Sequence, residues 1–445
     1  MKFRGLFAAA IVLAALTGTL YWSNHRKPAE STATASTDAP PKILTLNQAD
    51  ITGIEIKKQS GEGVSLGKTD AGYWQITAPK TLAADQEAVS SMLSTLSSLN
   101  SDRLVEDKAT NLDQYGLVQP SLEVDITKKD KKTEKLLIGD NTPAGSGAYA
   151  AVSGDPRVFI LATYNKSNID KSVNDFRDKR LLTFESDKLS RVELAAKKQN
   201  IEFGRNKDQW QIVKPKPLRA DGFQVDELVR ALHDAKMELA ATDDEKKTAA
   251  AFSSGTAIAT VKVTDVSGMQ ELQVRKNKDD YYAKSSVTAG VYKITSATAT
   301  AMDKSLDDFR NKKLFDFAFV DPAKIEIHDG ARSLVLSHSG ADWLSNGAKM
   351  DEASVATLLS SIRDLSASTF PDNGFAASVI EITVTSNEGK RVEKVLFSKN
   401  GDTYIAKREN EPALYEVASS SVTDLQKAAA ELKPAAVKPS TPPKK

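Results

Sequence analysis

One pattern occurs three times in this chain: an aspartate followed by apolar residues four, seven, eight and eleven positions further on. The copies begin at Asp85, Asp221 and Asp351. This spacing places the apolar side chains on one stripe of an amphipathic helix. Each aspartate stands where its carboxylate can accept the free backbone N–H groups at the start of that helix. The pattern indicates an internal repeat of one module.

A tryptophan precedes each copy, at positions 74, 210 and 343, so the intervals are 136 and 133 residues. A chain of 445 residues also corresponds to about three domains of roughly 150 residues each. The recurring Asp residues could instead be acids or metal ligands, and the Trp residues could stack on a sugar. We interpret the Asp residues as helix caps, each worth about 1 kcal/mol, and the Trp residues as core anchors.

Each unit is predicted to begin with short alternating strands, followed by the capped helix, a glycine-containing turn, a hairpin and two further strands. A short helix then closes the unit, over residues 169–180, 302–313 and 422–432. The predicted fold class is α+β, with three tandem repeats of short antiparallel sheets, each packed with one long and one short helix. The predicted segments are an anchor (1–22), a flexible tether (23–42), repeat units (43–184, 185–317 and 318–432) and a disordered Pro/Lys tail (433–445).

The first residues of the chain predict a transmembrane helix. Residues 5–22 carry no charge, and eighteen residues at about 1.5 Å each span about 27 Å, close to the thickness of a hydrocarbon core. A cleaved signal peptide is the alternative, but its cleavage site requires small residues where Tyr21 and Trp22 stand. These aromatic residues are typical of a membrane interface. We therefore expect a signal anchor in the inner membrane, with the bulk of the chain on the periplasmic side.

Composition excludes several kinds of site. Lys and Arg total 60 and Asp and Glu total 59, so no global field attracts nucleic acid, and we expect no such partner. The absence of cysteine excludes disulfides, thiolate metal sites, a cysteine nucleophile and lipid attachment through a cysteine. It is compatible with an oxidising compartment.

Three motifs of the first unit resemble a known bacterial family. They are Tyr115-Gly116-Leu117 followed by Pro120, then Leu137-Ile138-Gly139-Asp140, and finally Phe-Arg-Asp-Lys-Arg-Leu-Leu at residues 176–182. The family is the domain of unknown function 4340 (DUF4340). The resemblance implies a membrane-anchored, extracytoplasmic repeat protein, in a family often encoded beside components of ABC-type transporters such as those of gliding-motility systems. It implies no catalytic residues. The second unit keeps only Gly255 of the first motif, and the third keeps Gly374-Phe375.

Other constellations favour structural interpretations. Residues 61–69 mimic a phosphate-binding loop, but Glu62 stands where glycine is required, so we predict a hairpin turn. Ser65 and Lys68 lie three apart on a predicted strand and therefore point to opposite faces. His328 and His338 are too far apart to share a metal, and His233 is predicted to lie on the surface. The lysine-rich run 128–132 is interpreted as a solvated turn, with contact to anionic headgroups as the alternative.

These observations predict no catalytic, cofactor-binding or metal-binding residues. The leading hypothesis is a membrane-anchored, extracytoplasmic, non-enzymatic scaffold or accessory protein whose sheet edges and faces contact another envelope protein. The resemblance suggests an ABC-type transporter as that partner. The second hypothesis is a module that binds envelope glycan or lipid through the Trp-bearing units. An envelope hydrolase comes third, because the sequence shows no nucleophile or metal set.

Overall fold

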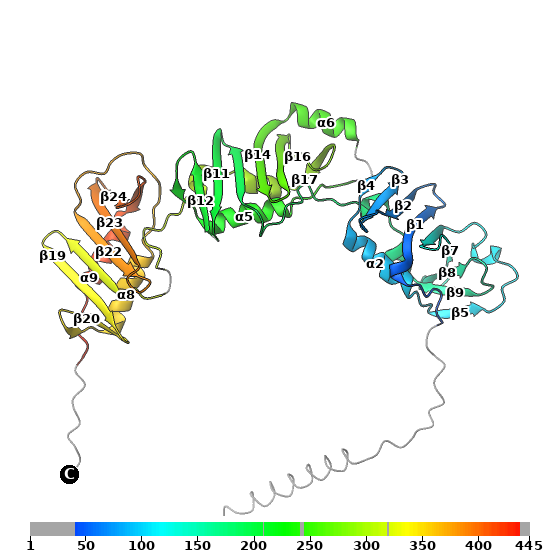
Figure 1. Cartoon of the computed structure of the whole chain (residues 1–445), viewed down its shortest axis with the longest axis horizontal. Coiled ribbons are helices and arrows are strands. Elements are labelled where there is room, and N and C mark those ends of the chain that lie inside the picture. Colours follow the sequence, from blue (N-terminus) through cyan, green and yellow to red (C-terminus); the bar gives the residue numbers. More distant parts are fainter. Residues whose placement is uncertain (1–40, 208, 241–243, 318–319, 437–445) are drawn as a thin grey trace, which may run out of the picture. The chain divides into compact units, whose positions relative to one another are not determined.

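Antiparallel strands with a long helix packed on one face of each sheet make up the protein in a computed structural model, which describes residues 41–207, 209–240, 244–317 and 320–436. These residues form three sheets of nine, eight and eight strands, here called sheets 1, 2 and 3 (Figure 1). The α+β prediction with three repeat-like sheets is confirmed. The chain divides after Asp178 into two compact units, one with sheet 1 and the other with sheets 2 and 3.

Sheet 1 has the strand order β4-β3-β2-β1-β6-β7-β8-β9-β5. Its strands are β1 (Ile51–Lys58), β2 (Gly63–Lys68), β3 (Trp74–Ala78), β4 (Leu82–Ala83), β5 (Arg103–Glu106), β6 (Leu122–Lys128), β7 (Thr133–Asn141), β8 (Gly147–Val152) and β9 (Val158–Ala162). Its helices are α2 (Gln86–Ser97), α3 (Thr163–Ile169) and α4 (Val173–Phe176), with 3₁₀ turns η1 (Gln48–Asp50) and η2 (Asp113–Tyr115).

Sheet 2 has the order β13-β12-β11-β10-β14-β15-β16-β17. Its strands are β10 (Arg191–Ala196), β11 (Gln199–Asn206), β12 (Gln209–Lys214), β13 (Leu218–Arg219), β14 (Thr256–Asp265), β15 (Gly268–Asn277), β16 (Asp280–Ser285) and β17 (Val291–Ile294). Its helices are α5 (Gly222–His233), α6 (Glu245–Ser254) and α7 (Ser296–Met302), with η3 (Leu306–Asp308).

Sheet 3 repeats this order as β21-β20-β19-β18-β22-β23-β24-β25. Its strands are β18 (Lys324–Asp329), β19 (Arg332–Ser339), β20 (Asp342–Ser345), β21 (Ala348–Lys349), β22 (Ile380–Ser386), β23 (Arg391–Asn400), β24 (Thr403–Arg408) and β25 (Leu414–Ala418). Its helices are α8 (Glu352–Arg363) and α9 (Ser419–Ala430).

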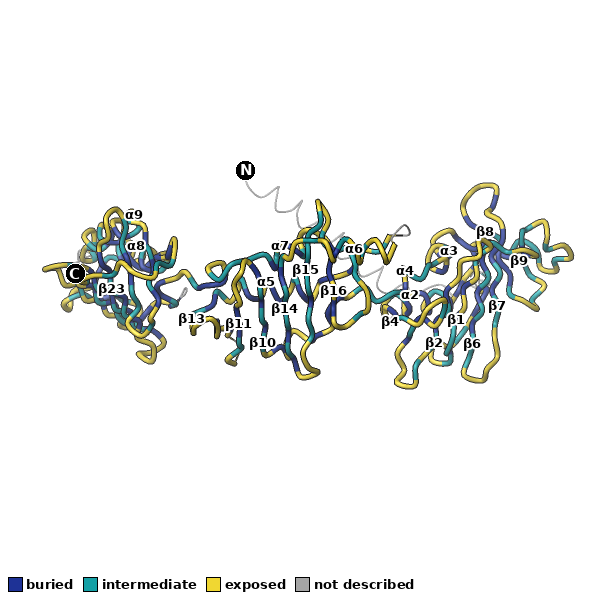
Figure 2. Tube along the Cα trace, turned by 90° about the horizontal axis from the view of Figure 1, so that it is seen from above, coloured by how far each residue is buried: buried dark blue, intermediate teal, exposed yellow. Residues whose placement is uncertain are grey.

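The central strands of every sheet alternate between buried and partly exposed residues, as Figure 2 shows along the tubes. Alternation of this kind buries one face of a sheet and leaves the other in contact with solvent. The buried face packs on the long helix, whose four predicted apolar residues are all at most 6% exposed. These residues are Val89, Met92, Leu93 and Leu96 in α2, Val225, Leu228, Val229 and Leu232 in α5, and Val355, Leu358, Leu359 and Ile362 in α8.

The three aspartates cap the long helices, as predicted. Asp85 accepts hydrogen bonds from two backbone N–H groups of α2, at 3.0 and 3.1 Å. Asp221 accepts one from Gln224 at 3.3 Å, and Asp351 accepts one from Ser354 at 3.0 Å. Each carboxylate therefore satisfies an N–H group that the helix cannot pair internally.

Two of the three predicted closing helices are wrong in extent. In place of a helix over 169–180, α3 ends at Ile169 and α4 is a single turn that ends at Phe176. In place of a helix over 302–313, α7 ends at Met302 and is followed by η3. The charged residues after these helices are extended, because their backbone pairs with other segments. The third closing helix, α9, matches its prediction within a few residues.

The predicted anchor lies outside the described residues, as do residues 23–40 of the tether and 437–445 of the tail. No helix within the described ranges has the length and apolar character needed to cross a bilayer. Residues at both ends of the described part are paired: Lys42 bridges Asn100, and Pro434 bridges Met350. The ordered part of the third unit therefore extends past residue 432. The unit boundaries after residues 184 and 317 stay predictions.

Loss of a cap should weaken sheet 1 measurably. Asp85→Ala removes both hydrogen bonds to the start of α2, so we expect the free energy of unfolding to fall by about 1 kcal/mol. Asp85→Asn keeps an acceptor oxygen and should stay within about 0.5 kcal/mol of the original chain. Urea unfolding measures both changes. Equal stability of the Ala and Asn variants would contradict the capping role.

Candidate functional site

The three tryptophans occupy equivalent positions in the three sheets. Each is paired across the strand register with a basic residue, in the pairs Lys68 with Trp74, Arg205 with Trp210 and His338 with Trp343. The Trp side chains are only 6 to 7% exposed. Their predicted role as core anchors is confirmed.

The paired residue lies against the face of each indole ring. The Lys68 ammonium lies 5.7 Å from the ring centroid of Trp74, and the Arg205 guanidinium 5.5 Å from that of Trp210. The His338 ring stacks on Trp343 with centroids 4.8 Å apart. Cations over indole rings are favourable contacts. These pairs were not predicted. The feature of the sequence that indicates them is a basic residue five or six positions before each Trp.

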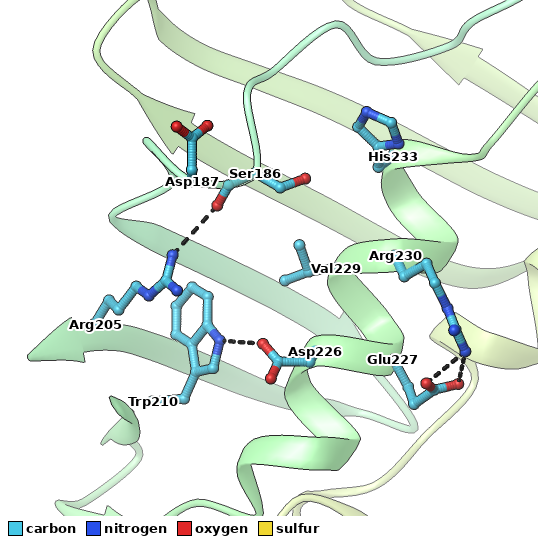
Figure 3. A pocket seen from close by; sticks show the side chains of 9 residues that line it. All are labelled: Ser186, Asp187, Arg205, Trp210, Asp226, Glu227, Val229, Arg230 and His233. Carbon is cyan, nitrogen blue, oxygen red and sulfur yellow. Dashed lines mark hydrogen bonds and ion pairs between the residues drawn. The ribbon is translucent and has the colours of Figure 1, made fainter. Parts of the chain in front are cut away.

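A surface cavity of about 420 Å³ lies beside Trp210 (Figure 3). The Trp210 Nε1–H donates to Asp226 at 2.8 Å, and Arg205 donates to the Ser186 carbonyl at 3.3 Å. Glu227 and Arg230 of the wall pair with each other, and the Nδ1 of His233 lies 3.0 Å from Asp234, while Asp187 also lines the cavity. Most of the charged groups of the wall are therefore held in hydrogen bonds or ion pairs with their neighbours.

The histidines form no metal site in the part of the chain that the structure describes, which contains no cluster of three His, Asp or Glu residues able to hold an ion. His328 faces Ser333 across the β18–β19 hairpin. His233 is exposed, as predicted, and its Nδ1 lies 3.0 Å from Asp234.

The two mimics of functional loops are turns and strands. Residues 63–68 form β2 instead of opening a helix, so the resemblance to a phosphate-binding loop is superficial. The run 128–132 lies at the turn between β6 and β7, as predicted. Two of its lysines pair with carboxylates outside the run: Lys128 with Glu134 at 2.7 Å, and Lys129 with Asp50 at 3.8 Å.

The first two family-like motifs meet on the face of sheet 1 opposite α2. We call this side of each sheet, away from the long helix, its open face. Gly116 has a φ of +66°, a conformation that favours glycine. A Cβ on Gly139 would lie only 2.1 Å from the Tyr115 carbonyl oxygen, so glycine is required there too. Leu117, 2% exposed, packs with Ala151 and Val158 in a small second core.

Tyr115 completes this second core with its ring and its hydroxyl. Its ring centroid lies 4.9 Å from that of Tyr149, and its hydroxyl lies 2.9 Å from Glu106 on β5. The hydrogen bond to the Glu106 carboxylate raises the pKa of Tyr115. The motif therefore fixes the segment between α2 and β6 on the sheet, which is a structural task.

In sheet 2 the corresponding region is covered by α6, a helix that was not predicted. Arg275 lies 5.1 Å from the Phe252 ring and donates to the carbonyl of Ser253 at 3.2 Å. Asn277 donates to the Ala251 carbonyl at 2.8 Å. A cation at a helix C-terminus is favourable, so these two side chains hold the end of α6.

The third motif, at residues 176–182, is a connector with each half paired to a different segment. The Phe176 carbonyl accepts a hydrogen bond from the Asp85 N–H at 2.7 Å, and Arg177 bridges Ala84. In the second compact unit, the Leu181 N–H donates to the Ala235 carbonyl at 2.9 Å.

The same connector geometry recurs in all three repeats. The Asp that caps each long helix donates its own backbone N–H to a carbonyl near the end of its repeat, at Phe176, Phe309 and Lys433. The residues before each sheet likewise bridge a segment just after the long helix, in the pairs Lys42 with Asn100, Arg180 with Lys236 and Lys313 with Ser366. The sequence at 433–435 has lost the motif but keeps the pairing.

A cluster of charged side chains lies where the connector between sheets 2 and 3, which we call the second connector, contacts sheet 3. We name it the Arg219 cluster; it consists of Arg219, Asp316, Arg391, Glu393, Arg408, Glu411 and Tyr415. A groove of about 740 Å³ runs along it. Burial alone would lower the pKa of Arg219, but Tyr415, Asp316 and Glu411 raise it overall. Burial raises the pKa of Tyr415.

A family model described as a domain of unknown function (DUF4340) matches residues 74–211 and, a second time, residues 210–379. Together the two matches cover more than half of the chain. The chain belongs to the DUF4340 family. No curated protein and no solved structure matches it.

Both DUF4340 matches begin at the Trp of the strand before the long helix. The first match extends through α2 and the connector into sheet 2, and the second extends through α5 and the next connector to the end of α8 and beyond.

Substitution of Gly139 tests the structural role of the DUF4340 motif. In Gly139→Ala the new methyl group meets the Tyr115 backbone, so we expect the free energy of unfolding to fall by about 1–3 kcal/mol. Gly222→Ala is the matched control, because a Cβ there meets nothing within 4 Å, and it should stay within about 0.5 kcal/mol. Urea unfolding compares the two; equal stability would contradict the assignment.

Proposed function

We propose that this protein is a membrane-anchored, extracytoplasmic scaffold or accessory protein without enzymatic activity, and that it associates with an ABC-type transporter. The family resemblance supports the transporter as partner, and the uncharged segment 5–22 supports an anchor in the inner membrane. The bulk of the chain would then lie in the periplasm. The observation that carries the proposal is a repeated polar surface on the open faces of the sheets.

Each central strand carries a glutamate at the same position of its open face, beside a cation two residues away. Lys57 lies 3.3 Å from Glu55, Arg191 lies 2.8 Å from Glu193, and Lys324 lies 2.8 Å from Glu326. The strand register places these three glutamates in equivalent positions. A polar surface repeated three times suits contact with a large partner better than capture of one small ligand.

Cross-strand contacts extend these pairs into ladders. On sheet 1, Lys57 also contacts Asp125 at 2.8 Å, and Lys135 contacts Glu123 at 2.6 Å. The hydrogen bond with Asp125 raises the pKa of Lys57. Groups held in such pairs stay charged at neutral pH, so they suit electrostatic recognition and not proton transfer.

The faces of the sheets support this role better than their edges. At one edge of each sheet, β4, β13 and β21 have two residues each, and the next residue of each bridges a connector or the chain end. The strands at the opposite edges, β5, β17 and β25, have four or five residues, and β17 and β25 are bridged by Glu238 and Thr369. Such short edges give an added strand little backbone to pair with. The proposal therefore assigns partner contact to the open faces.

The alternative function, binding of envelope glycan or lipid, relied on the Trp residues of the three units. Their burial and the basic side chains against them leave no free indole face for a sugar ring. No contact in the described residues favours this alternative over a scaffold.

Co-purification from solubilised membranes tests the proposal. We expect the full chain to recover a transporter component in constant ratio. The combined variant Glu55→Lys, Glu193→Lys and Glu326→Lys should lose at least half of that component while its circular dichroism stays unchanged, because the open-face pattern is reversed. Glu388→Lys, in the exposed β22–β23 turn, is the control of equal chemistry.

Two results would count against this account. Recovery of the protein alone from membranes would contradict the scaffold role. Undiminished recovery with the folded triple variant would contradict the assignment of contact to the open faces.

A further inference from the structure

Sheets 2 and 3 share one continuous core. Their buried residues, from Leu181 to Ala428, form a single cluster, while those of sheet 1 form clusters of their own. The connector between sheets 2 and 3 is held from both sides: Asn311 N–H donates to the Arg219 carbonyl at 3.0 Å, and Leu314 N–H donates to the Leu365 carbonyl at 3.1 Å. The two sheets of this unit are therefore joined by apolar packing and by backbone pairing.

The side chain of Arg219 forms a third link between sheets 2 and 3. It lies on β13 of sheet 2, yet its guanidinium contacts Asp316 at 2.5 Å and Glu411, on the β24–β25 turn, at 3.0 Å. It also donates to the hydroxyl of Tyr415 at 3.4 Å and to the Lys313 carbonyl. Its side chain is 20% exposed. A partly desolvated charge with several partners is expensive to separate from them.

The carboxylates that receive Arg219 are held by guanidinium groups of sheet 3. Arg391 contacts Asp316 at 3.2 Å, and Arg408 contacts Glu411 at 2.7 Å. Arg408 also contacts Glu393, which is 3% exposed, at 3.0 Å. Sheet 3 thus presents a fixed set of paired charges into which one cation of sheet 2 fits.

Sheet 2 makes the equivalent connector contacts with neutral side chains. The strand register places Gln270 where sheet 3 has Glu393, and Ser285 where sheet 3 has Arg408. Gln270 accepts from the Thr183 N–H at 2.8 Å, as Glu393 accepts from the Asp316 N–H at 3.2 Å. Equivalent residues of the two sheets therefore hold the connector, with neutral side chains in sheet 2 and charged side chains in sheet 3.

The residues equivalent to Arg219 behave differently. The register places Ala83 at this position in sheet 1 and Lys349 in sheet 3. Ala83 carries no charge. Lys349 pairs within its own sheet, with Asp342 at 2.6 Å. Arg219 is the residue of this set whose cation contacts another sheet of the same compact unit.

We infer that the β13 end of sheet 2 is a docking surface for sheet 3, that Arg219 determines this docking, and that sheets 2 and 3 consequently fold and unfold as one block. Arg310 assists from the connector, where its guanidinium lies 3.6 Å from the ring of Phe370. The inference is independent of the proposed scaffold function, since it concerns coupling within the chain and not a partner.

The absence of cysteine makes a direct test available. Val261→Cys on β14 and Ile382→Cys on β22 place single thiols at equivalent, fully buried positions of sheets 2 and 3. Thiol labelling of the full chain across a urea series then reports the unfolding of each sheet. In the presence of Arg219 we expect both thiols to become reactive at the same urea concentration.

Arg219→Ala should separate the two midpoints by about 1 M urea, because the ionic contact between the sheets is lost while the packing of each sheet on its own long helix remains. Asp316→Asn, a milder change to the same contact, should separate them in the same direction. Lys349→Ala is the matched control and should leave them together. Val124→Cys, at the equivalent position of sheet 1, should label identically with and without Arg219.

Either of two outcomes overturns the inference. The thiols of sheets 2 and 3 would become reactive at different urea concentrations while Arg219 is present, or both Arg219→Ala and Asp316→Asn would leave the two midpoints coincident.

Discussion

The structure depends on one hydrogen bond that is made three times: the aspartate that caps each long helix donates its own N–H to the chain as it leaves that repeat. The carboxylate of the same residue fixes the first turn of the helix. One residue therefore joins the start of the long helix to the end of the repeat. Because both contacts are local to the aspartate, the repeat closes on itself before the next sheet begins, and each sheet can bury its own helix stripe.

The connectors explain why the charged residues of the motif are not helical. The backbone at both ends of residues 177–180 pairs with other segments, so this stretch is extended. Just after the second connector, Asp316 pairs with Arg219 of sheet 2 and with Arg391 of sheet 3.

Periodicity predicted most of the fold, because the signal for a strand or an amphipathic helix lies within a dozen residues. The caps at Asp85, Asp221 and Asp351 and the buried stripes were predicted on this basis. The closing helices were overextended, because the charged residues 177–180 suit a helix locally and only distant pairing makes them extended. The Arg219 cluster was not predicted: Arg219 and Glu411 are 192 positions apart, and neither differs in sequence from many other charged residues. Helix α6 was missed because Phe252 is its only buried residue.

Hydrogen exchange at the backbone N–H of the three capping aspartates tests the central claim most directly. If each repeat is closed by this bond, the amides of Asp85, Asp221 and Asp351 exchange as slowly as those of the central strands β1, β10 and β18. Exchange of any one of the three at the rate of an exposed loop, while the central strand of its own sheet stays protected, would contradict the account.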